Sequence, residues 1–138
     1  MRRWVVDGLV AGAWAGAVSV VPSAVTAGAR PWWHSAQAAG NLLLPASAPP
    51  GRLLAVGATT RAAVALNWGV VLSRWLDRRH PVAHGTLAGL ALFGFQYVLV
   101  GRRRPLVAVL PALPQLADHL AYGAVAGAVL ARRRAPIR

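Results

Sequence analysis

Long apolar runs bounded by arginines constrain the fold of this chain more than any other feature. Four such runs cover approximately residues 4–29, 53–75, 82–100 and 114–131. A helix needs about 20 mostly apolar residues to cross a bilayer core of roughly 30 Å, and helices satisfy their own backbone groups in lipid. The sequence therefore predicts an all-α polytopic membrane protein, a four-transmembrane-helix bundle that forms one domain over residues 1–138.

The composition supports a membrane protein over a soluble one. Apolar residues make up 57% of the chain and charged residues 13%, whereas a soluble domain averages about 25% charged. The net charge of +12 would suggest nucleic acid on a soluble protein, but here the basic residues flank apolar runs, as membrane anchors do. We therefore expect the lipid bilayer as partner and no nucleic acid.

All basic residues are Arg and no Lys occurs, which favours a GC-rich bacterial genome and hence the bacterial cytoplasmic (inner) membrane. The chain has no Cys, which excludes disulfides and thiolate metal sites.

The first run has two interpretations. Arg2 and Arg3 precede it, and the triplet at 27–29 resembles a cleavage site. The first interpretation is therefore a cleaved signal peptide. Its length and Asp7 favour a retained helix, in which Pro22 predicts a kink. After this run, Trp32 and Trp33 predict an interfacial position, and a short interfacial helix followed by a proline-rich loop is expected before residue 53.

The arginines also predict the direction of threading, because cytoplasmic loops carry the excess of basic residues. With both termini inside, the inner side holds nine arginines and the outer side five, the nine being Arg2, Arg3, Arg74, Arg78, Arg79, Arg132, Arg133, Arg134 and Arg138. We therefore expect both termini in the cytoplasm.

Glycines at four-residue spacing predict close helix packing, because small residues on one helix face let a neighbouring backbone approach. They are Gly8, Gly12, Gly16, Gly85, Gly89, Gly123 and Gly127. The stretches 7–18 and 118–129 match at eight of twelve positions. A chance similarity between Ala/Gly-rich helices is preferred to a repeat, because the two stretches would run in opposite directions.

Two charged pairs are predicted inside or beside the membrane, where an unpaired charge is costly. Arg61 and Asp118 would lie at one depth in the outer half and form an ion pair, completed by His119 or Tyr122. Asp7 and Arg74 would pair near the inner face. The Arg61–Asp118 cluster has two main interpretations: structural glue between two helices, or an outward-facing polar pocket. In a third, Arg61 reaches the interface and pairs with nothing.

Other polar residues give no site. Gln96 and Tyr97 are expected to form interfacial hydrogen bonds, and Asn67 a bond across helices. His80 and His84 could share a helix face, but no third ligand completes a metal site. His34 and His119 do not suit a bis-His haem, and no G-x-S-x-G nucleophile motif occurs. We therefore expect no catalytic residues, metal or cofactor.

The closing run reads Asp118-His119-x-x-Tyr122-Gly123-x-x-x-Gly127. With the glycine-rich first run and the proline-containing first loop, it resembles small four-helix bacterial inner-membrane proteins of unknown function, the YagU-like family. The resemblance implies a four-helix membrane protein and no particular activity.

The polar inventory is small, which favours a non-enzymatic structural or accessory subunit, with a homo-oligomer or another membrane protein as possible partner. The alternative is a small oligomeric transporter or channel-like protein with a polar pocket around Arg61 and Asp118. A membrane-embedded enzyme would have Asp118 and His119 as its acid–base pair.

Overall fold

The computed structural model describes residues 2–27 and 29–135, with only the backbone described at 26, 27 and 29–32. All secondary-structure elements among the described residues are helices. They are α1 (Arg3–Val18), α2 (Val21–Ala27), α3 (Ala29–Gly40), α4 (Pro50–Trp75), α5 (Pro81–Phe95), the π-helical segment η1 (Gln96–Val100), α6 (Pro105–Ala108) and α7 (Ala112–Arg134).

The first apolar run breaks into two helices. Pro22 has no N–H and its ring would clash with the carbonyl of residue 18 in a continuous helix. The chain accordingly leaves α1 after Val18, turns at residues 19–20 and begins again as α2. Ser19 Oγ donates to the Gly16 carbonyl at 3.1 Å, and Ser23 Oγ donates to the Val20 carbonyl at 3.1 Å. These side chains therefore bond to backbone carbonyl groups around the break.

The segment after this run contains a helix, as expected. α3 has 12 residues and packs along α4. Gly40 and Gly57 make this packing close, because a Cβ at Gly57 would overlap the carbonyl oxygen of Ala36, and one at Gly40 would overlap that of Leu53. A loop containing Pro45 and Pro49 then leads into α4.

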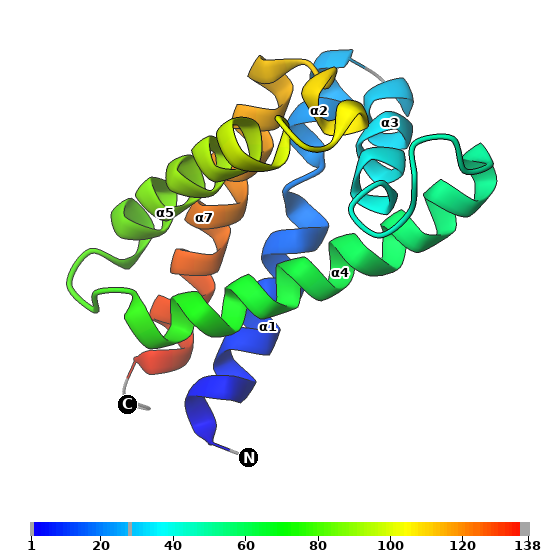
Figure 1. The fold of residues 1–138 in the computed structure, drawn as a ribbon. Helices are drawn as coiled ribbons and strands as arrows, with labels where there is room; N and C mark the ends of the chain where they lie inside the picture. The colour runs from blue at the N-terminus through cyan, green and yellow to red at the C-terminus, as the bar shows by residue number, and fades with distance from the viewer. Residues whose placement is uncertain (1, 28, 136–138) are drawn as a thin grey trace.

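The long helices do not form a parallel bundle, because α4 and α5 diverge (Figure 1). α1 packs against α4 and α7, and α7 packs against α5. α4 and α5 leave the short turn at residues 76–80 in diverging directions and make almost no contact with each other. α3 and α6 lie at the wide end between them, where α6 contacts both α3 and η1.

The glycine stripes lie inside this arrangement. A Cβ on Gly8 would come 2.5 Å from Val70 Cα, and one on Gly12 would come 2.5 Å from the carbonyl oxygen of Ala65. In the other half, Cβ atoms at Gly85 or Gly123 would collide with the backbone of the facing helix. The stripes therefore hold α1 to α4 and α5 to α7 within one chain, rather than facing outward.

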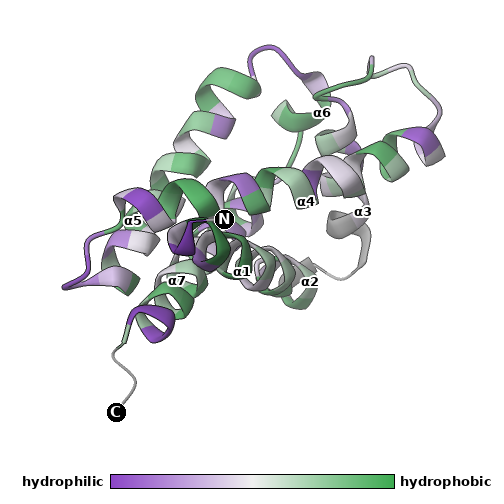
Figure 2. Ribbon diagram, turned by 90° about the horizontal axis from the view of Figure 1, so that it is seen from below, coloured by the Kyte–Doolittle hydropathy of each residue, from purple (hydrophilic) through white to green (hydrophobic). Residues whose placement is uncertain are grey.

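Among the described residues, three helical segments are long and apolar enough to cross a membrane: Arg3–Val25, Pro50–Trp75 and Pro81–Val100. α7 has 23 residues, a length of about 34 Å at 1.5 Å per residue, but it carries several polar side chains and is less apolar. Hydrophilic residues gather at the helix ends and turns, and the middles of the long helices are mostly hydrophobic (Figure 2). Large apolar side chains such as Leu87 and Leu90 on α5 are exposed, which suits contact with lipid.

The two ends of the described chain lie together. α1 and α7 run antiparallel, and both termini are found at one end of the molecule (Figure 1). Arg3 Nη2 donates to the carbonyl oxygen of Arg133 at 3.4 Å.

Candidate functional site

A cavity of about 710 Å³ occupies the space between the diverging helices α4 and α5. Many of its lining residues are small, among them alanines from α1, α3 and α4. Polar side chains also line it: Ser19, Ser35, Thr60, Arg61, Gln96, Gln115, Asp118, His119 and Tyr122. The cavity therefore has an apolar wall and a polar region.

Arg61 reaches the cavity from the middle of α4. Its Nη1 donates to Ser35 Oγ on α3 at 2.6 Å. Ser35 is a neutral partner, so this hydrogen bond orients the guanidinium without neutralising its charge. Ser35 was not singled out from the sequence, because α3 lies in the segment expected at the membrane interface.

Asp118 reaches the same cavity from α7. Its Oδ1 accepts a hydrogen bond from the backbone N–H of Ser23 at 3.0 Å. Its Oδ2 is buried without a hydrogen-bond partner. In an unbroken helix the Ser23 N–H would bond to the carbonyl four residues earlier, so the break before α2 frees this donor for the carboxylate. Pro22, from which the sequence predicts a kink, lies directly before the Ser23 N–H that the break makes available to Asp118.

The structure brings Arg61 and Asp118 to one cavity but does not join them in an ion pair. No Arg61 nitrogen lies within 4.0 Å of an Asp118 oxygen, the limit for the ion pairs found among the described residues. Ser35 and Ser23 hold the two charged groups on separate walls instead. The expected direct pair is therefore replaced by two charges that face a common space.

Tyr122 and His119 contact the helices on either side of α7, Tyr122 by a hydrogen bond to α4 and His119 by ring packing on α5. Tyr122 Oη donates to the carbonyl oxygen of Ala65 on α4 at 2.5 Å. His119 Nδ1 lies 2.7 Å from the carbonyl oxygen of Gln115, and because a carbonyl only accepts, Nδ1 carries the proton. Phe93 packs edge-on to the His119 ring at 5.9 Å. His119 thus bonds along its own helix, and no hydrogen bond joins it to Asp118 in the described chain.

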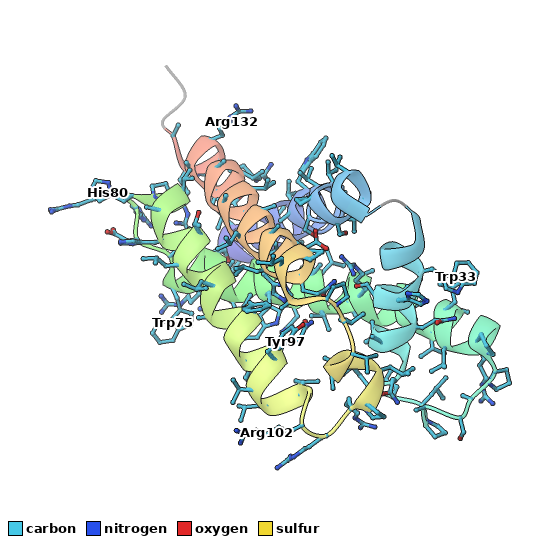
Figure 3. All side chains as sticks on the ribbon, turned by 90° about the horizontal axis from the view of Figure 1, so that it is seen from above. Trp33, Trp75, His80, Tyr97, Arg102 and Arg132 are labelled. Atoms are coloured by element: carbon cyan, nitrogen blue, oxygen red, sulfur yellow. The ribbon has the colours of Figure 1, made fainter. Side chains whose placement is uncertain are left out.

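Two glutamines complete the polar region. Gln96 Nε2 donates to Gln115 Oε1 at 3.4 Å, and Gln115 Nε2 is buried without a partner. Gln96 opens the π-helical segment η1, in which the Gly101 N–H bonds to the Gln96 carbonyl at 2.8 Å. Such segments are frequent at functional sites. Tyr97, in the same segment, donates to the carbonyl oxygen of Leu110 and points in among the helices (Figure 3).

No family model, curated protein or solved structure matches the chain. The resemblance to the YagU-like family thus has no support from these comparisons, and it stays a prediction.

The charged pair at the end with the termini differs from the one expected. Asp7 is buried and its Oδ1 accepts from Arg133 Nε at 2.7 Å, while Arg3 Nε lies 4.0 Å from Oδ2. Arg133, rather than Arg74, is therefore the partner of Asp7. The reason is the antiparallel packing of α1 on α7, which brings the last turn of α7 beside the first turns of α1.

The remaining predicted positions lie outside the cavity. Asn67 is exposed on α4, and among the described residues it forms no hydrogen bond across helices. Trp33 and Trp75 project outward (Figure 3), whereas the side chain of Trp32 lies outside the described residues. Within the described ranges no group of three His, Cys, Asp or Glu side chains could hold a metal ion. His84 Nδ1 lies 3.6 Å from Asp77 Oδ2 at the turn after α4.

Proposed function

We propose that this protein binds a small amphipathic anion in the cavity between α4 and α5, as a transporter or carrier does. The observation that supports this most is that Arg61 and Asp118 line one cavity on separate walls, with no ion pair between them. Charges removed from water are costly unless each meets a partner. A ligand whose anionic group reaches Arg61 would supply the negatively charged partner that Arg61 does not have among the described residues.

The other lining groups restrict the ligand. Gln115 Nε2 is an unsatisfied donor and Asp118 Oδ2 an unsatisfied acceptor, so the ligand needs acceptors for the first and a hydroxyl, amine or water for the second. Much of the remaining wall is apolar, with Leu92, Phe95 and Trp68 among its larger members. A carboxylate or phosphate head on a short apolar body fits both regions. The volume falls in the range of about 300–1,000 Å³ that is usual for ligand sites.

We further propose that the chain crosses the bacterial inner membrane four times, with both termini in the cytoplasm. The proximity of the two termini supports an even number of spans. The length of α7 and the excess of arginines at this end support it as well. The polar side chains that make α7 less apolar, Gln115, Asp118 and His119, line the cavity, so α7 need not present them to lipid.

Ligand-dependent stabilisation of the purified protein tests the proposal. The full chain in lipid nanodiscs would be melted with octanoate, with octyl phosphate and with octanol as the uncharged control. We expect the two anions to raise the melting temperature of the wild type and octanol to leave it unchanged. Arg61→Gln should abolish this rise, whereas Arg52→Gln, an exposed arginine on the same helix outside the cavity, should retain it.

Two results would contradict the proposal. One is the absence of any anion-dependent shift in the wild type. The other is an equal shift in Arg61→Gln and Arg52→Gln, which would leave Arg61 with a structural role and favour the accessory subunit predicted from the sequence. Arg61→Lys separates charge from geometry, because Lys retains the charge but lacks the two-pronged donor set of Arg.

A further inference from the structure

We propose that a second, independent site binds a phosphate group at the end of the molecule that carries both termini. Here Arg2, Arg74, Arg78 and Arg134 line a pocket of about 330 Å³, with Trp4 and Ser73 in its wall. We call this the arginine pocket. It lies at the far end of α4 from the wide end of the cavity. It rests on the threading proposed above, but not on ligand binding in the cavity.

Arg134 is the arginine of this pocket that is held by hydrogen bonds to the protein backbone. Arg134 Nη1 donates to the carbonyl oxygen of Leu76 at 3.3 Å, and Nη2 donates to that of Ser73. These carbonyls belong to the end of α4, where a helix leaves its last acceptors unsatisfied and favours positive charge. α7 is thereby tied to α4, and the guanidinium of Arg134 is held against the pocket.

The pocket concentrates positive charge without an acid of its own. No Asp belongs to its lining. Burial lowers the pKa of Arg134, which lies just beyond the proposed fourth span, and the positive charge of Arg78 lowers it further, while Asp7 acts in the opposite direction. Like charges held this close favour the binding of an anion between them.

Both acids at this end are engaged elsewhere. Asp7 is paired with Arg133 at 2.7 Å, with Arg3 at 4.0 Å. Asp77 accepts from the backbone N–H of Arg79 at 3.1 Å and lies 3.6 Å from His84. In contrast, the exposed side chains of Arg2, Arg74 and Arg78 have no hydrogen bond or ion pair within the described part of the chain.

The chemistry and position of the pocket point to phosphate. Arginine presents a planar fork of donors that matches phosphate oxygens. Basic pockets between membrane helices on the cytoplasmic side bind anionic headgroups, and Trp residues favour the interface where headgroups lie. Trp4 lines the pocket, and the neighbouring Trp75 is 82% exposed. The phosphate could be that of a phospholipid headgroup or free inorganic phosphate, two sources that experiment separates.

Binding to the purified full chain tests this site. Phosphatidylglycerol, phosphatidylcholine with the same acyl chains, and inorganic phosphate would each be titrated into the protein in neutral detergent, with tryptophan fluorescence and lipid adducts in native mass spectrometry as readouts. We expect phosphatidylglycerol to bind more tightly than phosphatidylcholine. Arg74→Gln/Arg78→Gln should weaken this binding about tenfold or more, because it removes two charge-assisted contacts.

A matched control removes the same charge elsewhere. Arg102→Gln/Arg103→Gln changes two exposed arginines in the loop between η1 and α6 and should leave the affinity unchanged. If inorganic phosphate alone binds and the same pair of arginines is required, the site takes free phosphate. Equal weakening by both double variants, or no binding of either anion, would overturn the proposal. If the Arg74/Arg78 variant does not fold, Arg78→Gln alone, which changes only the turn after α4, gives the same comparison against Arg102→Gln.

Discussion

At the scale of single residues, Arg61, Asp118 and Asp7 each bond to a partner that the tertiary fold brings to them. The depth argument placed Arg61 and Asp118 together, and both line the cavity. It could not supply Ser35 or the backbone N–H of Ser23, because those partners depend on how α3 folds back and where the helix breaks at Pro22. In the same way, Asp7 bonds to Arg133 because of the register of α1 on α7, which hydropathy does not encode.

The pairing of Asp7 gives a residue-scale prediction. In a double-mutant cycle of Asp7→Asn and Arg133→Gln, we expect a coupling energy of about 0.5–3 kcal/mol, as found for residues in direct contact. The readout is the free energy of unfolding in mixed micelles. The cycle of Asp7→Asn with Arg74→Gln should show coupling near zero. Stronger coupling to Arg74 than to Arg133 would favour the pair expected from the sequence.

At the scale of elements, the helix boundaries were largely predictable because arginine clusters and prolines mark them. The second run, expected at 53–75, is the helix Pro50–Trp75, and the third, expected at 82–100, is the helix Pro81–Phe95 with η1. The first run was expected to kink, and the structure divides it into α1 and α2. The π-helical segment was not predicted, since one extra residue within a turn leaves no trace in an apolar pattern.

Two glycines on α5 allow a matched test of the helix packing. A Cβ at Gly89 would overlap the carbonyl oxygen of His119, whereas at Gly94 it would meet no atom within 4 Å. Gly89→Ala should therefore destabilise the protein by about 1–3 kcal/mol through overpacking. Gly94→Ala should be neutral or stabilise it by up to about 1 kcal/mol through helix propensity. Both are measured as unfolding free energies in micelles, and equal effects would contradict the α5–α7 contact.

At the scale of the whole molecule, the sequence predicted a helical membrane protein but not its interior. Hydropathy places helices across a bilayer, and it says little about how neighbouring helices tilt. The divergence of α4 from α5 creates the cavity, and it arises because each packs on a different partner, α1 and α7 respectively. The glycines allow the close packing of α1 on α4 and of α5 on α7, although their spacing in the sequence did not predict which helices would pack together.

The threading can be tested cleanly because the chain has no cysteine. Single-cysteine variants Arg79→Cys, Arg103→Cys and Ala135→Cys would be labelled with a membrane-impermeant maleimide in bacterial cells. With four spans, residue 103 should react in cells whose inner membrane is intact, and residues 79 and 135 only after that membrane is permeabilised. Reaction of residue 135 from outside, with residue 79 protected, would show that α7 does not cross the membrane.

The contact between the first and last helices also has a consequence for biosynthesis. The partner of Asp7 lies 126 positions later in the chain, so at about 5–20 residues per second a ribosome makes Arg133 roughly 6–25 s after Asp7. For most of that interval Arg3 is the only one of the two arginines near Asp7 that has been made. The cavity then lacks the wall that Gln115, Asp118 and Tyr122 provide. The wall of the cavity that α7 provides can therefore be added only after the helices that precede it in the chain have been made.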